Sequence, residues 1–63
     1  MEALIGIREA STMLGLRVST LYSYVERRIL PHVKLGTRLL FEPRKLEQWV
    51  AKRAVAPVAE AGQ

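Results

Sequence analysis

Residues 7–28 read IREASTMLGLRVSTLYSYVERR, and their pattern predicts two short helices joined by a glycine turn. Apolar residues recur in its first part at the spacing of one helix face: Ile7, Ala10, Met13 and Leu14. We therefore predict a helix over residues 7–14, with Met13 in the core. Gly15 stands directly after it, where a left-handed glycine commonly ends a helix.

The second part of the stretch predicts another short helix, from Ser19 to about Arg28. The segment contains no Gly or Pro, and its inward-facing positions follow the same helical spacing: Leu21, Tyr24, Val25 and Arg28. Ser19 is a candidate cap for the first turn, because a serine hydroxyl accepts well from free backbone amides. Pro31 is expected to end this helix.

Residues 32–41, HVKLGTRLLF, are typical of a β-hairpin around Gly36 and Thr37. Alternation along each arm places four apolar residues on the predicted inner face: Val33, Leu35, Leu39 and Phe41. The other face is expected to carry Lys34, Arg38 and Leu40. Glu42-Pro43 is predicted to open a third helix, because proline is tolerated in a first helical turn. Its predicted buried face is formed by Leu46, Trp49, Val50 and Arg53.

The order of these elements predicts a mainly α domain with a small hairpin, in the arrangement of a winged helix-turn-helix. We assign residues 1–53 to this single domain. Residues 54–63 contain small residues with a proline and a glycine, and we expect them to form a disordered tail.

Charge supplies the first indication of function. The net charge is +4 and the sequence pI is about 10.1. Between Arg17 and Arg53, nine basic residues against three acidic ones give that segment a charge of +6. Arginine outnumbers lysine seven to three, and its planar fork suits phosphate and guanine. The pattern favours a nucleic acid partner, although excess positive charge also serves solubility.

Several other classes of protein are disfavoured. The chain has no cysteine and only one histidine, His32, so we expect no structural zinc and no other cofactor. The four glutamates of the predicted elements are scattered, and no Ser, His and Asp converge on a pocket, so we expect neither enzymatic activity nor a small-molecule substrate. No apolar run approaches the length of a membrane span. We expect a cytoplasmic protein.

The chain resembles the excisionase family of DNA-binding domains, and it is also similar to the DNA-reading half of the mercury-resistance-type regulators. The resemblance runs from Ile5 to about Val50. It depends on Glu9-Ala10, Leu14-Gly15-Leu16, Ser19-Thr20-Leu21-Tyr22, the run from Leu30 to Gly36, Arg38 with Phe41, and Leu46 with Trp49. The family often has glycine before Leu-Pro, where this chain has Arg28-Ile29, so we expect a less tight turn into the hairpin.

The resemblance implies sequence-specific binding to double-stranded DNA. An excisionase-like role would be architectural: binding adjacent sites, bending the DNA and steering an integrase toward excision of a phage or mobile element. Cooperative self-association on DNA would accompany it, with a monomer in solution. A small transcriptional regulator of phage or mobile-element genes is the alternative within the same class.

The candidate DNA-binding residues lie on the second helix and on the hairpin, or wing: Arg17, Ser19, Thr20, Tyr22, Ser23, Arg27, Lys34, Thr37 and Arg38. The start of a second helix is the part that reaches base edges in the major groove. A basic wing tip lies along the backbone or enters the minor groove. Arg17 is a candidate guanine contact, and Arg27 a phosphate contact.

A different class of function is also open. The same fold could recruit an integrase or a polymerase through an apolar surface, and a shared patch of Tyr22, Ile29 and Leu40 would be its signature. Trp49 and Tyr24 are expected to pack in the core, whereas Tyr22 is expected at its edge.

Overall fold

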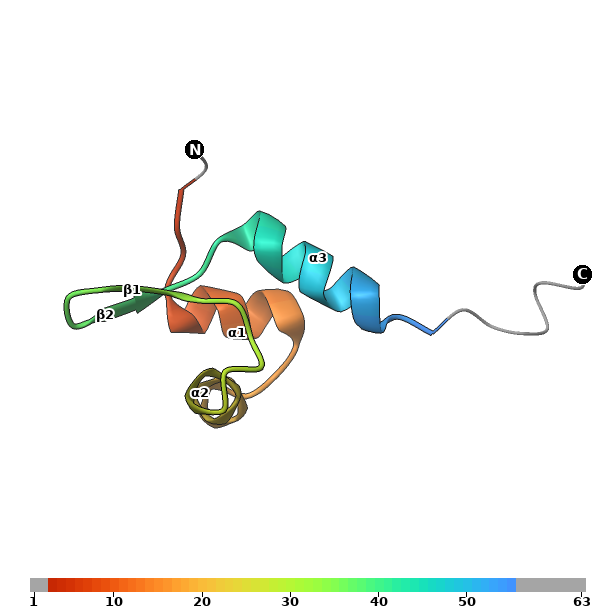
Figure 1. The fold of residues 1–63 in the computed structure, drawn as a ribbon, viewed down its shortest axis with the longest axis horizontal. Coiled ribbons are helices and arrows are strands. Elements are labelled where there is room, and N and C mark those ends of the chain that lie inside the picture. Colours follow the sequence, from red (N-terminus) through yellow and green to blue (C-terminus); the bar gives the residue numbers. More distant parts are fainter. Residues whose placement is uncertain (1–2, 56–63) are drawn as a thin grey trace, which may run out of the picture.

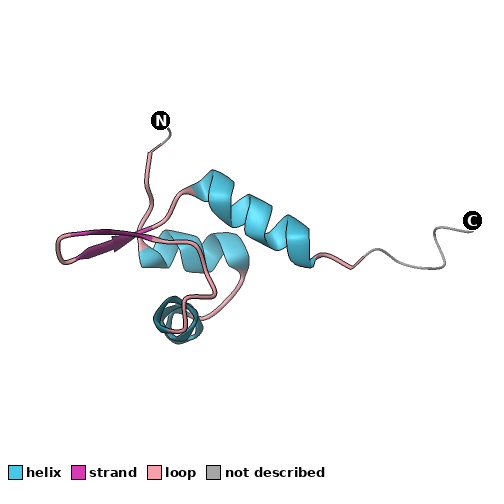
Figure 2. Ribbon diagram, viewed as in Figure 1, coloured by secondary structure: helices cyan, strands magenta, loops and turns pink. Residues whose placement is uncertain are grey.

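The computed structural model describes residues 3–55 and confirms the predicted fold class (Figures 1 and 2). The elements, in chain order, are α1 (Ile7–Leu14), α2 (Val18–Glu26), β1 (Val33–Leu35), β2 (Arg38–Leu40) and α3 (Pro43–Arg53). In Figure 1, α1 lies between α2 and α3, and the wing of β1 and β2 projects on the side opposite the C-terminal end of α3. Most of the tail predicted over residues 54–63 lies outside the described residues.

The turn from α1 into α2 is closed by two local devices. Gly15 adopts the left-handed conformation, with φ of 69°, as predicted. The backbone N–H groups of Gly15 and Leu16 both donate to the carbonyl of Ser11, and the Ser11 hydroxyl donates to the carbonyl of Leu16. These bonds satisfy groups that the end of a helix leaves without intrahelical partners.

Helix α2 begins one residue earlier and ends two residues earlier than predicted. Arg17 is its N-cap and makes no side-chain capping bond, so Ser19 lies inside the first turn and does not cap the helix. Pro31 does not end the helix. Arg28 does so by adopting a left-handed φ of 56°, and the N–H of Ile29 then donates to the carbonyl of Tyr24 over 2.9 Å. The turn into the wing is therefore tight even without glycine.

The wing is a two-residue hairpin whose register corrects the predicted faces. Its Cα pairs are Val33 with Leu40, Lys34 with Leu39, and Leu35 with Arg38. Because directly opposed residues of antiparallel strands point to the same side, Leu39 shares a face with Lys34. Val33 and Leu35 lie on the other face together with Leu40 and Arg38. Leu35 is 55% exposed and does not belong to the core.

The core takes one buried residue from each helix and one from each of the two segments that flank the wing. Its members are Ala10, Leu21, Leu30, Phe41 and Leu46. Partly buried apolar residues surround them, among them Leu39, Val25 and Trp49. The prediction that Met13 and Val50 are buried was wrong, since their side chains are 40% and 46% exposed. Each lies at the edge of the apolar face of its helix. Arg28 and Arg53, also placed on inner faces, are exposed.

Three long-range contacts fix the wing and α3 to the rest of the fold. Ile5 and Phe41 form an antiparallel bridge, with backbone hydrogen bonds of 2.9 and 2.8 Å in the two directions. The indole N–H of Trp49 donates to the carbonyl of Ile29 over 2.8 Å, and the ring of Tyr24 is tilted against it at 6.1 Å between centroids. Trp49 therefore joins α3 to the connection between α2 and the wing.

Candidate nucleic-acid interface

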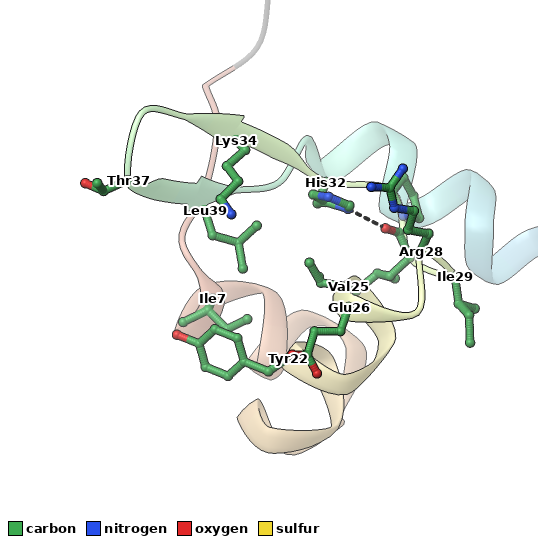
Figure 3. Close-up of a pocket in the computed structure, with 12 residues that line it drawn as sticks. Ile7, Tyr22, Val25, Glu26, Arg28, Ile29, His32, Lys34, Thr37 and Leu39 are labelled. Atoms are coloured by element: carbon green, nitrogen blue, oxygen red, sulfur yellow. Dashed lines mark hydrogen bonds between the residues drawn. The ribbon is translucent and has the colours of Figure 1, made fainter.

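A broad groove runs between α2 and the wing (Figure 3). Its volume is about 1220 Å³, above the roughly 300–1,000 Å³ that is usual for small-molecule pockets. The lining residues come from α1, α2, the connection after α2 and the wing: Ile7, Tyr22, Val25, Glu26, Arg28, Ile29, Leu30, Pro31, His32, Lys34, Thr37 and Leu39.

The groove has an apolar floor and a polar rim. Ile7, Val25 and Leu39 are half-buried and pack against the core, so they form an apolar floor. Exposed polar side chains surround this floor: Tyr22, Glu26, Arg28, His32, Lys34 and Thr37. Three of these carry amine, guanidinium or imidazole groups, and one carries a carboxylate. The rim can therefore hold an anionic chain while the floor excludes water beneath it.

The fold itself positions the polar rim. Helix α2 turns Tyr22 toward the groove while Leu21 points into the core. The strand pairing of the wing places Lys34 above Leu39, on the face that looks toward α2 (Figure 3). His32 is held by its Nδ1–H, which donates to the carbonyl of Leu30 over 2.9 Å. A carbonyl only accepts, so Nδ1 carries the hydrogen in this bond.

Three of the nine predicted contact residues meet in this groove: Tyr22, Lys34 and Thr37. The remaining six do not line it. Arg17 and Arg27 are exposed at the two ends of α2 as its N-cap and C-cap. Arg38 is exposed on the outer face of the wing, beside Leu35.

Ser19, Thr20 and Ser23 lie along α2 itself. Ser19 and Ser23 are one helical turn apart on the side opposite buried Leu21, which is the side available to a ligand. Thr20 is half-buried and precedes Tyr24 by one turn, so it lies on the flank away from Tyr22.

The groove also contains three polar residues that the sequence did not assign to it. Glu26 follows Tyr22 by one helical turn, and this spacing was a usable signal. His32 directly precedes the first strand of the wing, where its neighbours were already candidates. Arg28 gave no signal in the sequence, because the helical spacing assigned it an inward position, whereas it lies in a left-handed turn after the helix and lines the groove.

The apolar patch expected of an interaction module does not form as one surface. Tyr22 and Ile29 line the groove, whereas Leu40 pairs with Val33 on the opposite face of the wing. Leu40 is also half-buried. Residues 3–55 contain no helix long and apolar enough to cross a membrane. In the same part of the chain, no group of three or more His, Cys, Asp or Glu residues is arranged to hold a metal ion.

Comparison with known proteins identifies a family for the chain. The family described as a helix-turn-helix domain matches residues 4–54. Neither the curated proteins nor the solved structures contain a match to the chain. The matched segment includes all three helices, the wing and every residue that lines the groove. The chain therefore belongs to the helix-turn-helix domain family.

Proposed function

We propose that this protein binds double-stranded DNA sequence-specifically, with α2 in the major groove and the wing over the neighbouring minor groove. The observation that carries the proposal is the groove between α2 and the wing, with Lys34 and Arg28 on its rim. A protein that reads a major groove with one element and the next minor groove with another must straddle the phosphate backbone between them. We place this DNA backbone in the groove between α2 and the wing.

The surface of α2 supports base readout. Ser19 and Ser23 lie on the side opposite the core, and short hydroxyl side chains accept from or donate to base edges in the major groove. Arg17, at the start of the helix, has the reach to contact guanine. Helix-turn-helix proteins use the N-terminal part of this helix for the same purpose.

Within this class we favour an excisionase-like role: an architectural factor that bends DNA and directs an integrase to excise a phage or mobile element. The support is the resemblance of residues 5–50 to the excisionase family. Such a protein would work in the cytoplasm, would need no cofactor and would have no enzymatic activity of its own. A transcriptional regulator of the same elements is the alternative within the class.

One experiment addresses binding and bending together. Duplexes from the DNA upstream of the gene, and generic duplexes of equal length, carry a fluorophore pair at their ends. Anisotropy reports binding and energy transfer between the ends reports bending. We expect saturable binding that favours the upstream DNA, and energy transfer that rises at saturation because bending brings the ends together.

The outcomes separate the alternatives. Preferential binding without a rise in energy transfer would favour the transcriptional regulator over the architectural factor. No binding at low salt, where electrostatic attraction to phosphate is strongest, would contradict DNA binding altogether and would favour a protein-interaction module.

A further inference from the structure

Arg28 has a backbone conformation that arginine rarely adopts. Among residues 3–55 it is the only residue other than glycine with a positive φ, at 56°. For an L-amino acid this region brings Cβ close to the following carbonyl, and so it is disfavoured for every residue with a side chain. The conformation is maintained by two backbone hydrogen bonds, from Arg28 to Val25 and from Ile29 to Tyr24.

The backbone conformation at position 28 is one that glycine normally occupies. A left-handed residue directly after a helix is usually glycine, which adopts that conformation without the Cβ penalty. Gly15 performs this task at the end of α1, with φ of 69°. The same hydrogen bonds would form with glycine at position 28, so the turn itself gives no reason for an arginine side chain.

The side chain of Arg28 does not stabilise the fold in any visible way. It is exposed, and within residues 3–55 it has no hydrogen bond, ion pair or ring contact. Arg53, by comparison, lies over the ring of Trp49 at 4.2 Å and donates to the carbonyl of Trp49. The Arg28 side chain instead lines the groove, at the end formed by the connection between α2 and β1 (Figure 3).

We propose that Arg28 binds a backbone phosphate of the DNA strand in the groove, and that its strained conformation is what aims the guanidinium there. The proposal rests on the proposed function and adds to its groove one specific contact with an anion. A guanidinium presents paired N–H donors that match two phosphate oxygens. Lys34, on the wing, would neutralise the same strand as a point charge. Conformational strain that persists at a binding surface is often part of its function.

The test compares two variants that remove the same charge but differ in backbone demand, Arg28→Gly and Arg28→Ala. Both should bind generic and upstream DNA about 5- to 10-fold more weakly at low salt, and the slope of log K against log salt should become shallower by about one. Their melting temperatures should differ, with the glycine variant about 4–8 °C above the alanine variant, because only alanine retains the left-handed penalty. Arg28→Lys should keep the slope and lose part of the affinity.

Lys52→Ala is the matched control for charge, because Lys52 is exposed on α3 and does not line the groove. It should change affinity and slope by much less than either Arg28 variant. If the Arg28 variants bind with the affinity and slope of the unaltered protein, the phosphate contact is refuted. If they bind weakly but melt together, the contact stands and the strain is refuted. If the unaltered protein itself does not bind DNA, the proposed function fails first.

Discussion

At the scale of single residues, left-handed backbone positions define the corners of this domain. Gly15 turns the chain between the first two helices, Arg28 turns it toward the wing, and Gly36 turns it at the wing tip with φ of 63°. Glycine occupies two of these positions at no steric cost. The sequence identified the glycine corners, but it could not identify Arg28, because no residue-type preference predicts a left-handed arginine.

Gly15→Ala measures the energetic value of such a corner. An added methyl group would meet no neighbouring atom within 4 Å, so the whole cost should come from the backbone conformation. We expect destabilisation by about 1 kcal/mol, which lowers the melting temperature by about 4–8 °C in a domain of this size. Thermal unfolding followed by circular dichroism measures it.

Gly6→Ala is the matched control for that measurement. Gly6 also has open space around its Cβ position, but its φ of −85° is accessible to any residue. Its melting temperature should stay close to that of the unaltered protein. Equal melting temperatures for the two variants would contradict a conformational role for Gly15.

At the scale of elements, side-chain alternation predicts the two faces within one strand of the wing but not the register between its strands. Alternation correctly placed Lys34 on the opposite face from Val33 and Leu35. How the two arms match, however, depends on the turn, and a turn of Gly36 and Thr37 pairs Leu35 with Arg38. The outer face of the wing consequently carries exposed Leu35 and Arg38 side by side, and the inner face carries Lys34.

Arg38→Ala should weaken binding to all DNA sequences and make the salt slope shallower by about one. Arg38 is exposed near the wing tip, on the face away from the groove, so we expect it to contact the minor groove or its flanking phosphates. Anisotropy titrations at several salt concentrations, on upstream and generic duplexes, measure both quantities. A loss confined to one base position would instead assign Arg38 to base readout.

At the scale of the whole molecule, the order of elements was predictable because each boundary had a local cause. Helical spacing, Gly15 and Pro43 determine where α1 and α3 lie, and both were predicted at the observed positions. The groove was only half predictable. Tyr22, Lys34 and Thr37 were identified. The hydrogen bond between Trp49 and Ile29, which joins residues 20 apart in the chain, depends on packing that no local pattern contains.

The size of the interface limits how strongly salt can act. One module of this kind should make about four to six phosphate contacts, which predicts a slope of log K against log salt of about −4 to −5 per protomer. We expect a monomer in solution, as measured by sedimentation, and this slope from titrations at low protein concentration. A slope near zero would show that phosphate contacts do not dominate the affinity.

The single tryptophan of the chain also gives the protein an intrinsic optical probe. Its indole N–H donates a hydrogen bond to the carbonyl of Ile29, the residue directly after Arg28. The guanidinium of Arg53 lies over the same indole ring. Emission from an indole changes with its hydrogen bonding and with nearby charge. A ligand that displaces the connection between α2 and the wing would therefore change the tryptophan fluorescence of the unlabelled protein. The rate of this change after mixing would give the rate at which the ligand docks.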